Sequence, residues 1–304
     1  MEPQRTRPAV HIAQGLLMGG ADVIPGVSGG TMALIVGIYE RLLRNVSAAF
    51  HAIVSLPRGG AAVREAFRRV EWGFVLPLGL GILTAIGIGS KVIPGLLERY
   101  PEEARALFFG LVLASVAIPW IRMEERAAAE YLLVPVTALL AFVLVGLPPA
   151  EISDPSLVHV FFSAAIAICA MILPGVSGSF LLAVLGMYTA TLHALSEINI
   201  PYVLTFCAGA AVGLGVFSRL LNWLLEKHHD RTMAALVGLM AGSLRALWPW
   251  QDADRALRMP AAGDSVGWAL GLGLAGFTFV ALLTWWGHRR IEEAATPHHG
   301  HLHD

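Results

Sequence analysis

The stretch "DVIPGVSGGTMALIVGIY", residues 22–39, interrupts an apolar segment with proline, serine and several glycines. The stretch "MILPGVSGSFLLAVLGMY", residues 171–188, resembles it closely, because positions 25–39 and 174–188 share seven of fifteen residues. Proline ends a helix, and glycine allows a tight reversal without side-chain bulk. The sequence therefore predicts a helix break of the same kind in each half of the chain.

The composition is that of an integral membrane protein. Of the 304 residues, 56% are hydrophobic and only 14% are charged, which a soluble chain of this length does not show. The formal net charge of -1 offers no basic field for nucleic acid, so we expect no nucleic-acid partner. Cys169 and Cys207 lie in apolar segments and are interpreted as small core residues, with no metal site expected.

Six apolar segments are long enough to cross a bilayer as helices, since an open strand is not viable in lipid. They are residues 72–97, 104–121, 131–147, 202–225, 232–248 and 266–287. The two regions that contain PGVSG, 8–44 and 156–195, have arms of roughly 13 to 17 residues, enough to reach the midplane. Residues 45–71 are expected to form a long polar, basic loop.

The chain is predicted to consist of two homologous halves. Besides the PGVSG blocks, "ALFFGLVLAS" (106–115) aligns with "AALVGLMAGS" (234–243). The repeats are residues 8–147 and 156–287, flanked by an N-terminal tail, 1–7, and a His-rich C-terminal tail, 288–304. If each PGVSG region enters and leaves on one side, each half crosses the membrane three times, and the second half is inverted.

Charge supports this topology. With the N-terminus inside, fifteen of the 21 lysines and arginines fall on the cytoplasmic side and six outside, as the positive-inside rule requires. Full crossings by the PGVSG regions would place loop 45–71 opposite the N-terminus. The predicted fold is an all-α polytopic membrane protein with two inverted-topology repeats, each a re-entrant PGVSG helical hairpin plus three transmembrane helices. Both termini are expected to be cytoplasmic.

The helix breaks have the chemistry of an anion site. Ser28 and Ser177 are natural N-caps for the returning helices. The first amides of those helices, near Gly29 and Gly178, lack partners within the helix and carry positive dipole character. Two such helix starts that face one another suit a phosphate. The alternative is an ordinary kink in a packed bundle, with glycines that serve close helix contact.

Three charged residues stand out in the apolar segments. Asp22 lies beside the first break, where it could carry a coupling proton or act as a cap, and its counterpart is Met171. Lys91 and Arg219 are equivalent positions in the two halves and could admit an anionic head group from either side. Alternatively, they snorkel to the interface or pair with Glu98 and Glu226.

The two motifs resemble the signatures of the DUF368 membrane proteins over about residues 8–287. The resemblance implies transport of undecaprenyl phosphate from the outer to the inner leaflet of the bacterial cytoplasmic membrane, which recycles this carrier lipid for the cell wall. It implies membrane lipids as partners and no cofactor, although a coupling proton or sodium ion is compatible with the motifs. The oligomeric state is left open. The family motif maps onto Gly26, Val27, Ser28, Gly29, Gly30 and Thr31, and onto Gly175, Val176, Ser177, Gly178 and Ser179.

Two other functions compete with transport of a lipid phosphate. Integral membrane undecaprenyl-diphosphate phosphatases look similar, but their PGxSRS motif has arginine where this chain has Gly29 and Gly178. Their paired glutamates are also missing from the apolar segments. Without an arginine, hydrolysis loses its main electrostatic aid, so the chain is not expected to be an enzyme. The second alternative is a transporter of a small soluble anion.

Overall fold

A computed structural model describes residues 7–24, 27–55, 59–252 and 255–295 of the chain. Within these residues the fold is helical throughout, and the one β-type contact is an isolated bridge between Gln251 and Leu257. The helices are α1 (Pro8–Asp22), α2 (Gly29–Ile35), α3 (Tyr39–Val54), α4 (Gly60–Arg68), α5 (Trp72–Arg99), α6 (Pro101–Ser115), α7 (Ala117–Ile121), α8 (Ala128–Leu144), α9 (Leu157–Ile172), α10 (Gly178–Val184), α11 (Tyr188–Ser196), α12 (Ile200–Lys227), α13 (His229–Ser243), the 3₁₀ turn η2 (Leu244–Leu247) and α14 (Val266–Ala295).

In the described part of the chain, four helical stretches are long and apolar enough to cross a membrane. They are Trp72–Arg99, Pro101–Ile121, Ile200–Lys227 and Val266–Trp285, which confirms four of the six predicted spans. The other two predicted spans, 131–147 and 232–248, form α8 of 17 residues and α13 of 15 residues followed by η2, and neither is among these four stretches. Most of α13 is buried, because it lies against α8 and is covered by other helices instead of facing lipid.

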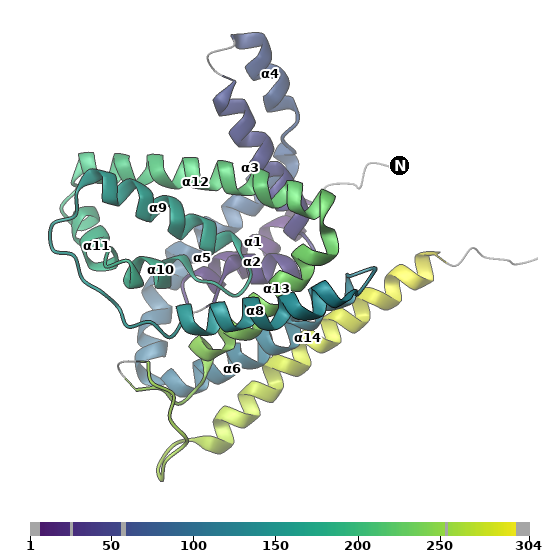
Figure 1. The fold of residues 1–304 in the computed structure, drawn as a ribbon, viewed down its shortest axis with the longest axis vertical. Helices are drawn as coiled ribbons and strands as arrows, with labels where there is room; N and C mark the ends of the chain where they lie inside the picture. The colour runs from purple at the N-terminus through teal and green to yellow at the C-terminus, as the bar shows by residue number, and fades with distance from the viewer. Residues whose placement is uncertain (1–6, 25–26, 56–58, 253–254, 296–304) are drawn as a thin grey trace, which may run out of the picture.

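Two helix pairs lie within the halves of the chain, and two further pairs connect one half to the other. Helix α1 packs along α5, and α9 packs along α12, while α6 packs against α14 and α8 against α13 (Figure 1). Glycines permit the closest approaches. A Cβ on Gly15 would lie 2.1 Å from the Leu78 carbonyl oxygen, and one on Gly209 would lie 2.2 Å from that of Phe161. Small residues at such crossings are the usual means of bringing membrane helices together.

Residues 45–71 are not the loop that the sequence suggested. Helix α3 continues to Val54 and α4 occupies Gly60–Arg68, so the two form a helical arm that projects from the rest of the molecule (Figure 1). The correction follows from amphipathicity. Tyr39 and Leu43 are buried on one side of α3, while Arg64 and Arg68 of α4 are exposed. Such a charged and apolar pattern is typical of helices that lie at a membrane surface.

The returning arms are also broken a second time, although they were expected to continue to residues 44 and 195. Helix α2 and helix α10 each have only seven residues. Both are followed by a glycine with φ of 74°, Gly37 and Gly186, a conformation that ends a helix. The chain then turns, and α10 and α11 are bent by 107°.

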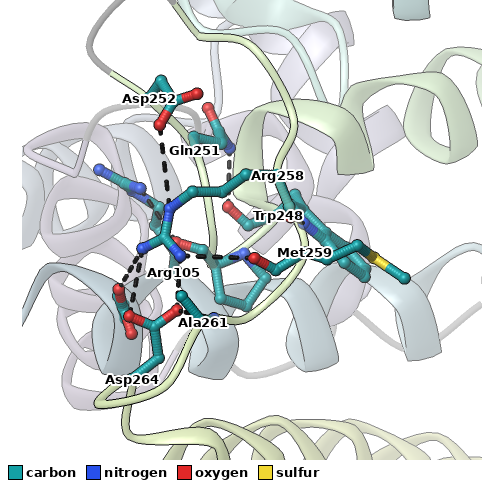
Figure 2. Close-up of polar contacts among 10 residues, drawn as sticks. Arg105, Trp248, Gln251, Asp252, Arg258, Met259, Ala261 and Asp264 are labelled. Atoms are coloured by element: carbon teal, nitrogen blue, oxygen red, sulfur yellow. Dashed lines mark hydrogen bonds and ion pairs between the residues drawn. The ribbon is translucent and has the colours of Figure 1, made fainter.

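The segment between η2 and α14 folds back onto the start of α6. Figure 2 shows Arg258 between Asp252 and Asp264, and its Nη2 also donates to Glu102 of α6 at 2.9 Å. The Trp248 indole donates to the carbonyl oxygen of Arg258 at 3.0 Å. The hydrogen bond from Arg258 lowers the pKa of the Asp264 carboxyl below its ordinary value. This segment therefore links α13, α14 and α6 at one end of the molecule.

Candidate functional site

The first break, residues 23–28, lies between α1 and α2. Ser28 has an extended backbone, and its Oγ accepts a hydrogen bond from the Gly30 amide at 3.1 Å, which confirms the predicted N-cap. Asp22 closes α1, and its Oδ1 accepts from the Gly29 amide at 2.7 Å. The first two amides of α2 are thus occupied by oxygen acceptors from the same half of the chain.

The second break, residues 173–177, lies between α9 and α10 and is satisfied differently. Ser177 holds the N-cap position with an extended backbone but makes no side-chain cap. Its hydroxyl lies 2.9 Å from the hydroxyl of Ser179 instead, so the predicted capping role of Ser177 is wrong. Met171 provides no carboxylate where the first half has Asp22. Among the described residues, no hydrogen bond is made by the amides of Gly178 and Ser179.

The two breaks contact each other directly in the interior. The Ser28 hydroxyl lies 2.9 Å from the Met171 carbonyl oxygen and 3.3 Å from that of Leu173, so it donates between the two. The Gly175 amide donates to Thr31 Oγ1 at 2.8 Å. Ser28 and Thr31 are wholly buried, and Ser177 is nearly so. A phosphate could therefore enter between the two breaks only after they separate.

The remaining motif residues shape the contact. Val27 and Val176 are buried apolar residues with no polar side chain to offer. Gly175 has φ of 88°, and a Cβ there would lie 2.9 Å from Cα of Met240. Pro25 and Gly26 lie outside the described residues, so the predicted part of Gly26 in the site stays a prediction.

The structure does not bring Lys91 or Arg219 to the breaks. Lys91 is exposed on α5, and within the described part of the chain it forms no ion pair, including with Glu98. Arg219 is exposed on α12 and donates from Nη2 to His51 Nδ1 at 3.2 Å. It lies in a recess that also contains Arg44 and Arg69. Sequence reasoning missed those two arginines, and the only signal for them was the basic character of residues 41–69.

An apolar groove of about 540 Å³ begins beside the first break. Ile24, which follows α1, is one of its lining residues, and the walls come from α5, α6 and α14, with Glu103 as the one charged residue of the lining. Residues of both halves form it, including Leu97 of α5 and Leu272 of α14. The groove has the dimensions and surface of a binding site for a hydrocarbon chain.

Neither break has the composition of a metal centre. Within the described residues, no group of three or more histidine, cysteine, aspartate or glutamate side chains is close enough to hold a metal ion. The chemistry at the breaks is instead that of helix-start amides, hydroxyl groups and a single carboxylate, which suits reversible binding of an anion.

Ser28→Ala is expected to lower the free energy of unfolding by about 1–3 kcal/mol, because buried partners lose a cap and a donor. Ser177→Ala should cost less, since it removes only the contact with Ser179. The double variant should still fold. Thermal unfolding of the purified variants measures the difference. Equal losses from the two single substitutions would show that the two breaks are structurally equivalent.

The fold and the site together define a class, a polytopic helical membrane protein in which two broken helices meet. Broken helices at the membrane centre are typical of secondary transporters. The chain belongs to the undecaprenyl phosphate translocase-like family, whose sequence pattern matches residues 18–264. This is the DUF368 family that the two motifs resemble.

Two curated relatives align over most of their length. A polyprenyl-phosphate transporter of Vibrio cholerae is 38% identical over 253 residues, which are 83% of this chain and 81% of the relative. A polyprenyl-phosphate transporter of Staphylococcus aureus is 27% identical over 261 residues, 79% of this chain and 86% of the relative. No solved structure matches the chain. Both relatives are named as transporters and not as enzymes, in agreement with the sequence prediction.

Proposed function

We propose that this protein moves polyprenyl phosphate across the membrane, with undecaprenyl phosphate taken from the outer to the inner leaflet of the bacterial cytoplasmic membrane. The observation that carries the proposal is the direct contact of the two breaks, from Ser28 to Met171 near the end of α9 and from Thr31 to Gly175 in the second break. The names of the two relatives support the substrate class. A lipid phosphate needs such a protein, because an uncompensated charge in hydrocarbon costs many kcal/mol.

The two halves are proposed to be inverted repeats with cytoplasmic termini. The matching packing of α1 on α5 and of α9 on α12 supports two equivalent units. The exchange of partners, α6 with α14 and α8 with α13, supports a pseudo-two-fold relation between them. In this arrangement each break is the tip of a re-entrant hairpin, and rocking one unit against the other exposes the site to alternate sides.

The phosphate is proposed to bind between the breaks once they separate. On the second side it meets the amides of Gly178 and Ser179, whose positive dipole ends lack a described acceptor. On the first side the Asp22 carboxylate already occupies the Gly29 amide. A dianionic phosphate repels that carboxylate, so binding there requires Asp22 to move away or to take up a proton.

This competition favours a proton over sodium as the coupling ion. The sequence allowed sodium to be held by carbonyls at the end of the helix that leads into each break. In the second break, however, the carbonyl oxygens of Met171 and Leu173 already accept from Ser28. Asp22 is an acid in direct contact with the start of α2, and protonating it would remove the charge that repels the substrate and weaken its hydrogen bond to the Gly29 amide.

The isoprenoid tail is proposed to lie in the apolar groove that Ile24 helps to line. Ile24 is two residues from Asp22, so a lipid with its head group at the breaks would place the first part of its tail there. The groove opens between residues of both halves, and the rest of a long chain can remain in the bilayer.

Gly29 and Gly178, which stand where the phosphatases have arginine, have close neighbours, and this disfavours phosphatase activity. A Cβ on Gly29 would lie 2.5 Å from Asp22 Oδ2, and one on Gly178 would lie 2.9 Å from the Ala167 carbonyl oxygen. At Gly178 the obstacle is backbone, and at Gly29 a side chain would require the Asp22 carboxylate to leave the Gly29 amide.

Reconstitution into liposomes tests the proposal. A short polyprenyl phosphate with a fluorophore on its tail is placed in one leaflet, and its exchange is followed by reduction of the exposed dye. Wild-type protein should speed the exchange of this lipid. The same labelled polyprenol without phosphate, and inorganic phosphate, should not be moved. No acceleration under any imposed proton or sodium gradient, or equal movement of inorganic phosphate, would contradict the proposal.

A further inference from the structure

A basic recess of about 430 Å³ lies at the base of the arm, where α3 meets α12. Its charged and aromatic lining consists of Arg44, His51, Arg69, Arg219, Trp223 and Glu226. The recess is formed by elements far apart in the sequence, since Asn222 of α12 donates to the Leu43 carbonyl oxygen of α3 at 3.0 Å. This hydrogen bond holds the two sides of the recess together.

The charges in the recess are unbalanced. Three guanidinium groups face one carboxylate, that of Glu226. Arg69 pairs with Glu65 at 3.0 Å and Arg44 with Glu40 at 3.9 Å, but the side chains of both pairs are well exposed. Surface pairs of this kind contribute about 0–1 kcal/mol and are readily exchanged for a stronger partner.

Arg219 is the least compensated of the three arginines. Its recorded partner is the His51 ring, and Nδ1 must be unprotonated to accept this hydrogen bond, so the ring brings no negative charge. Within the described residues, no carboxylate lies within ion-pair distance of Arg219. An exposed arginine on a membrane-crossing helix is costly and usually has a functional partner.

The position of Arg219 suits a lipid head group. It lies eight residues before the end of α12 at Lys227, about 12 Å along the helix axis. Trp223, one turn further on, is half exposed, as expected for an aromatic side chain at the membrane interface. Guanidinium groups bind phosphate oxygens in pairs of parallel hydrogen bonds, and several arginines together select a doubly charged phosphate.

We propose that the basic recess binds the phosphate of a membrane-borne phosphate monoester as a docking site separate from the two breaks. The identification of that monoester with the transported lipid rests on the proposed function, and the binding of phosphate does not. The equivalent position in the first half, Lys91, lies outside the recess, so docking of this kind belongs to one face of the protein.

Chemical modification of individual arginines can show whether a ligand occupies the recess. Purified wild-type protein is treated with phenylglyoxal, and modified residues are quantified by mass spectrometry with and without farnesyl phosphate. Modification of Arg219 and Arg69 should slow about fivefold or more in its presence, as expected for side chains held by a tightly bound anion. Arg64 and Arg68, exposed on α4 outside the recess, serve as internal controls.

Two further arms identify the source of the phosphate. Farnesol has the same tail without the charge and should give no protection. Inorganic phosphate should protect only at concentrations well above those of farnesyl phosphate, because it lacks the tail that partitions into the bilayer or micelle. Protection by inorganic phosphate at equal concentration would identify a site for free phosphate and overturn the lipid assignment. If neither farnesyl phosphate nor inorganic phosphate protects these arginines, the proposal that the recess binds phosphate is wrong.

A matched pair of double variants connects the recess to transport. Arg69→Gln with Arg219→Gln should weaken farnesyl phosphate binding by about tenfold, equivalent to 1.4 kcal/mol, and slow leaflet exchange. Arg64→Gln with Arg68→Gln removes the same net charge and should leave both unchanged. If the first variant binds farnesyl phosphate more weakly but the wild-type protein moves no lipid, the proposed function is refuted and the recess remains a phosphate-binding site. If both variants bind farnesyl phosphate and exchange lipid equally well, the recess is not the docking site, and the proposed function still stands.

Discussion

Gly30→Ala is expected to abolish most transport and to lower the free energy of unfolding by about 1–3 kcal/mol. A Cβ at this position would lie 2.4 Å from the Ile172 carbonyl oxygen, far inside van der Waals contact. The obstacle is backbone at the end of α9, so the two breaks must move apart. The hydrogen bond from Ser28 to the Met171 carbonyl oxygen would then lengthen, which weakens the contact that positions the start of α2 against the end of α9.

Gly20→Ala is the matched control for this substitution. Gly20 also lies in a short apolar helix near the first break, but a Cβ there would meet nothing within 4 Å. Alanine should leave transport unchanged and stabilise α1 slightly, by about 0.5–1 kcal/mol. Leaflet exchange in liposomes and thermal unfolding in detergent measure both effects. If Gly30→Ala transported as well as Gly20→Ala, close contact between the breaks would not be required for function.

Two different substitutions of Asp22 should separate its role as an acceptor for the Gly29 amide from its role as a carrier of a coupling proton. Asp22→Ala removes the acceptor for the Gly29 amide, so we expect a loss of about 1–2 kcal/mol in stability and most of the transport. Asp22→Asn keeps a carbonyl oxygen for that amide but no longer exchanges a proton. This variant should unfold close to the wild-type temperature, yet its leaflet exchange should no longer respond to a proton gradient.

The comparison of these variants needs a control for the loss of one acid. Asp154→Asn removes a carboxylate in an exposed loop and should change neither the stability nor the gradient response. Thermal unfolding and exchange rates at several imposed pH gradients provide the measurements. An Asp22→Asn protein that still responds to the gradient would exclude Asp22 as the coupling group and leave it only a capping role.

Much of the architecture was predictable because it depends on local chemistry. Proline and glycine in the two PGVSG motifs interrupt helices wherever they occur, so the breaks could be placed from the sequence. Of the six apolar segments that predicted membrane-crossing helices, four form helices long and apolar enough to cross, since lipid leaves the backbone few other structures. The second pair of breaks was missed, because Gly37 and Gly186 stand alone in apolar surroundings, where glycine also occurs within membrane helices.

The candidate site was predictable only in part. Ser28 and Ser177 have identical neighbours in sequence, and both were expected to cap a helix. The structure separates them, because Asp22 and a pair of carbonyl groups surround Ser28, whereas Ser177 finds only the hydroxyl of Ser179. Local patterns cannot distinguish two such environments.

The sequence alone determined that this is a helical membrane protein with two related broken helices, because apolar length and helix breaking are properties of short segments. Only the tertiary structure decided that the breaks are joined, since the hydrogen bond from Ser28 to Met171 links residues 143 positions apart. It also decided that Arg44, Arg69 and Arg219 share one recess. Contacts between distant segments depend on how whole helices pack, and no local pattern of residues records that packing.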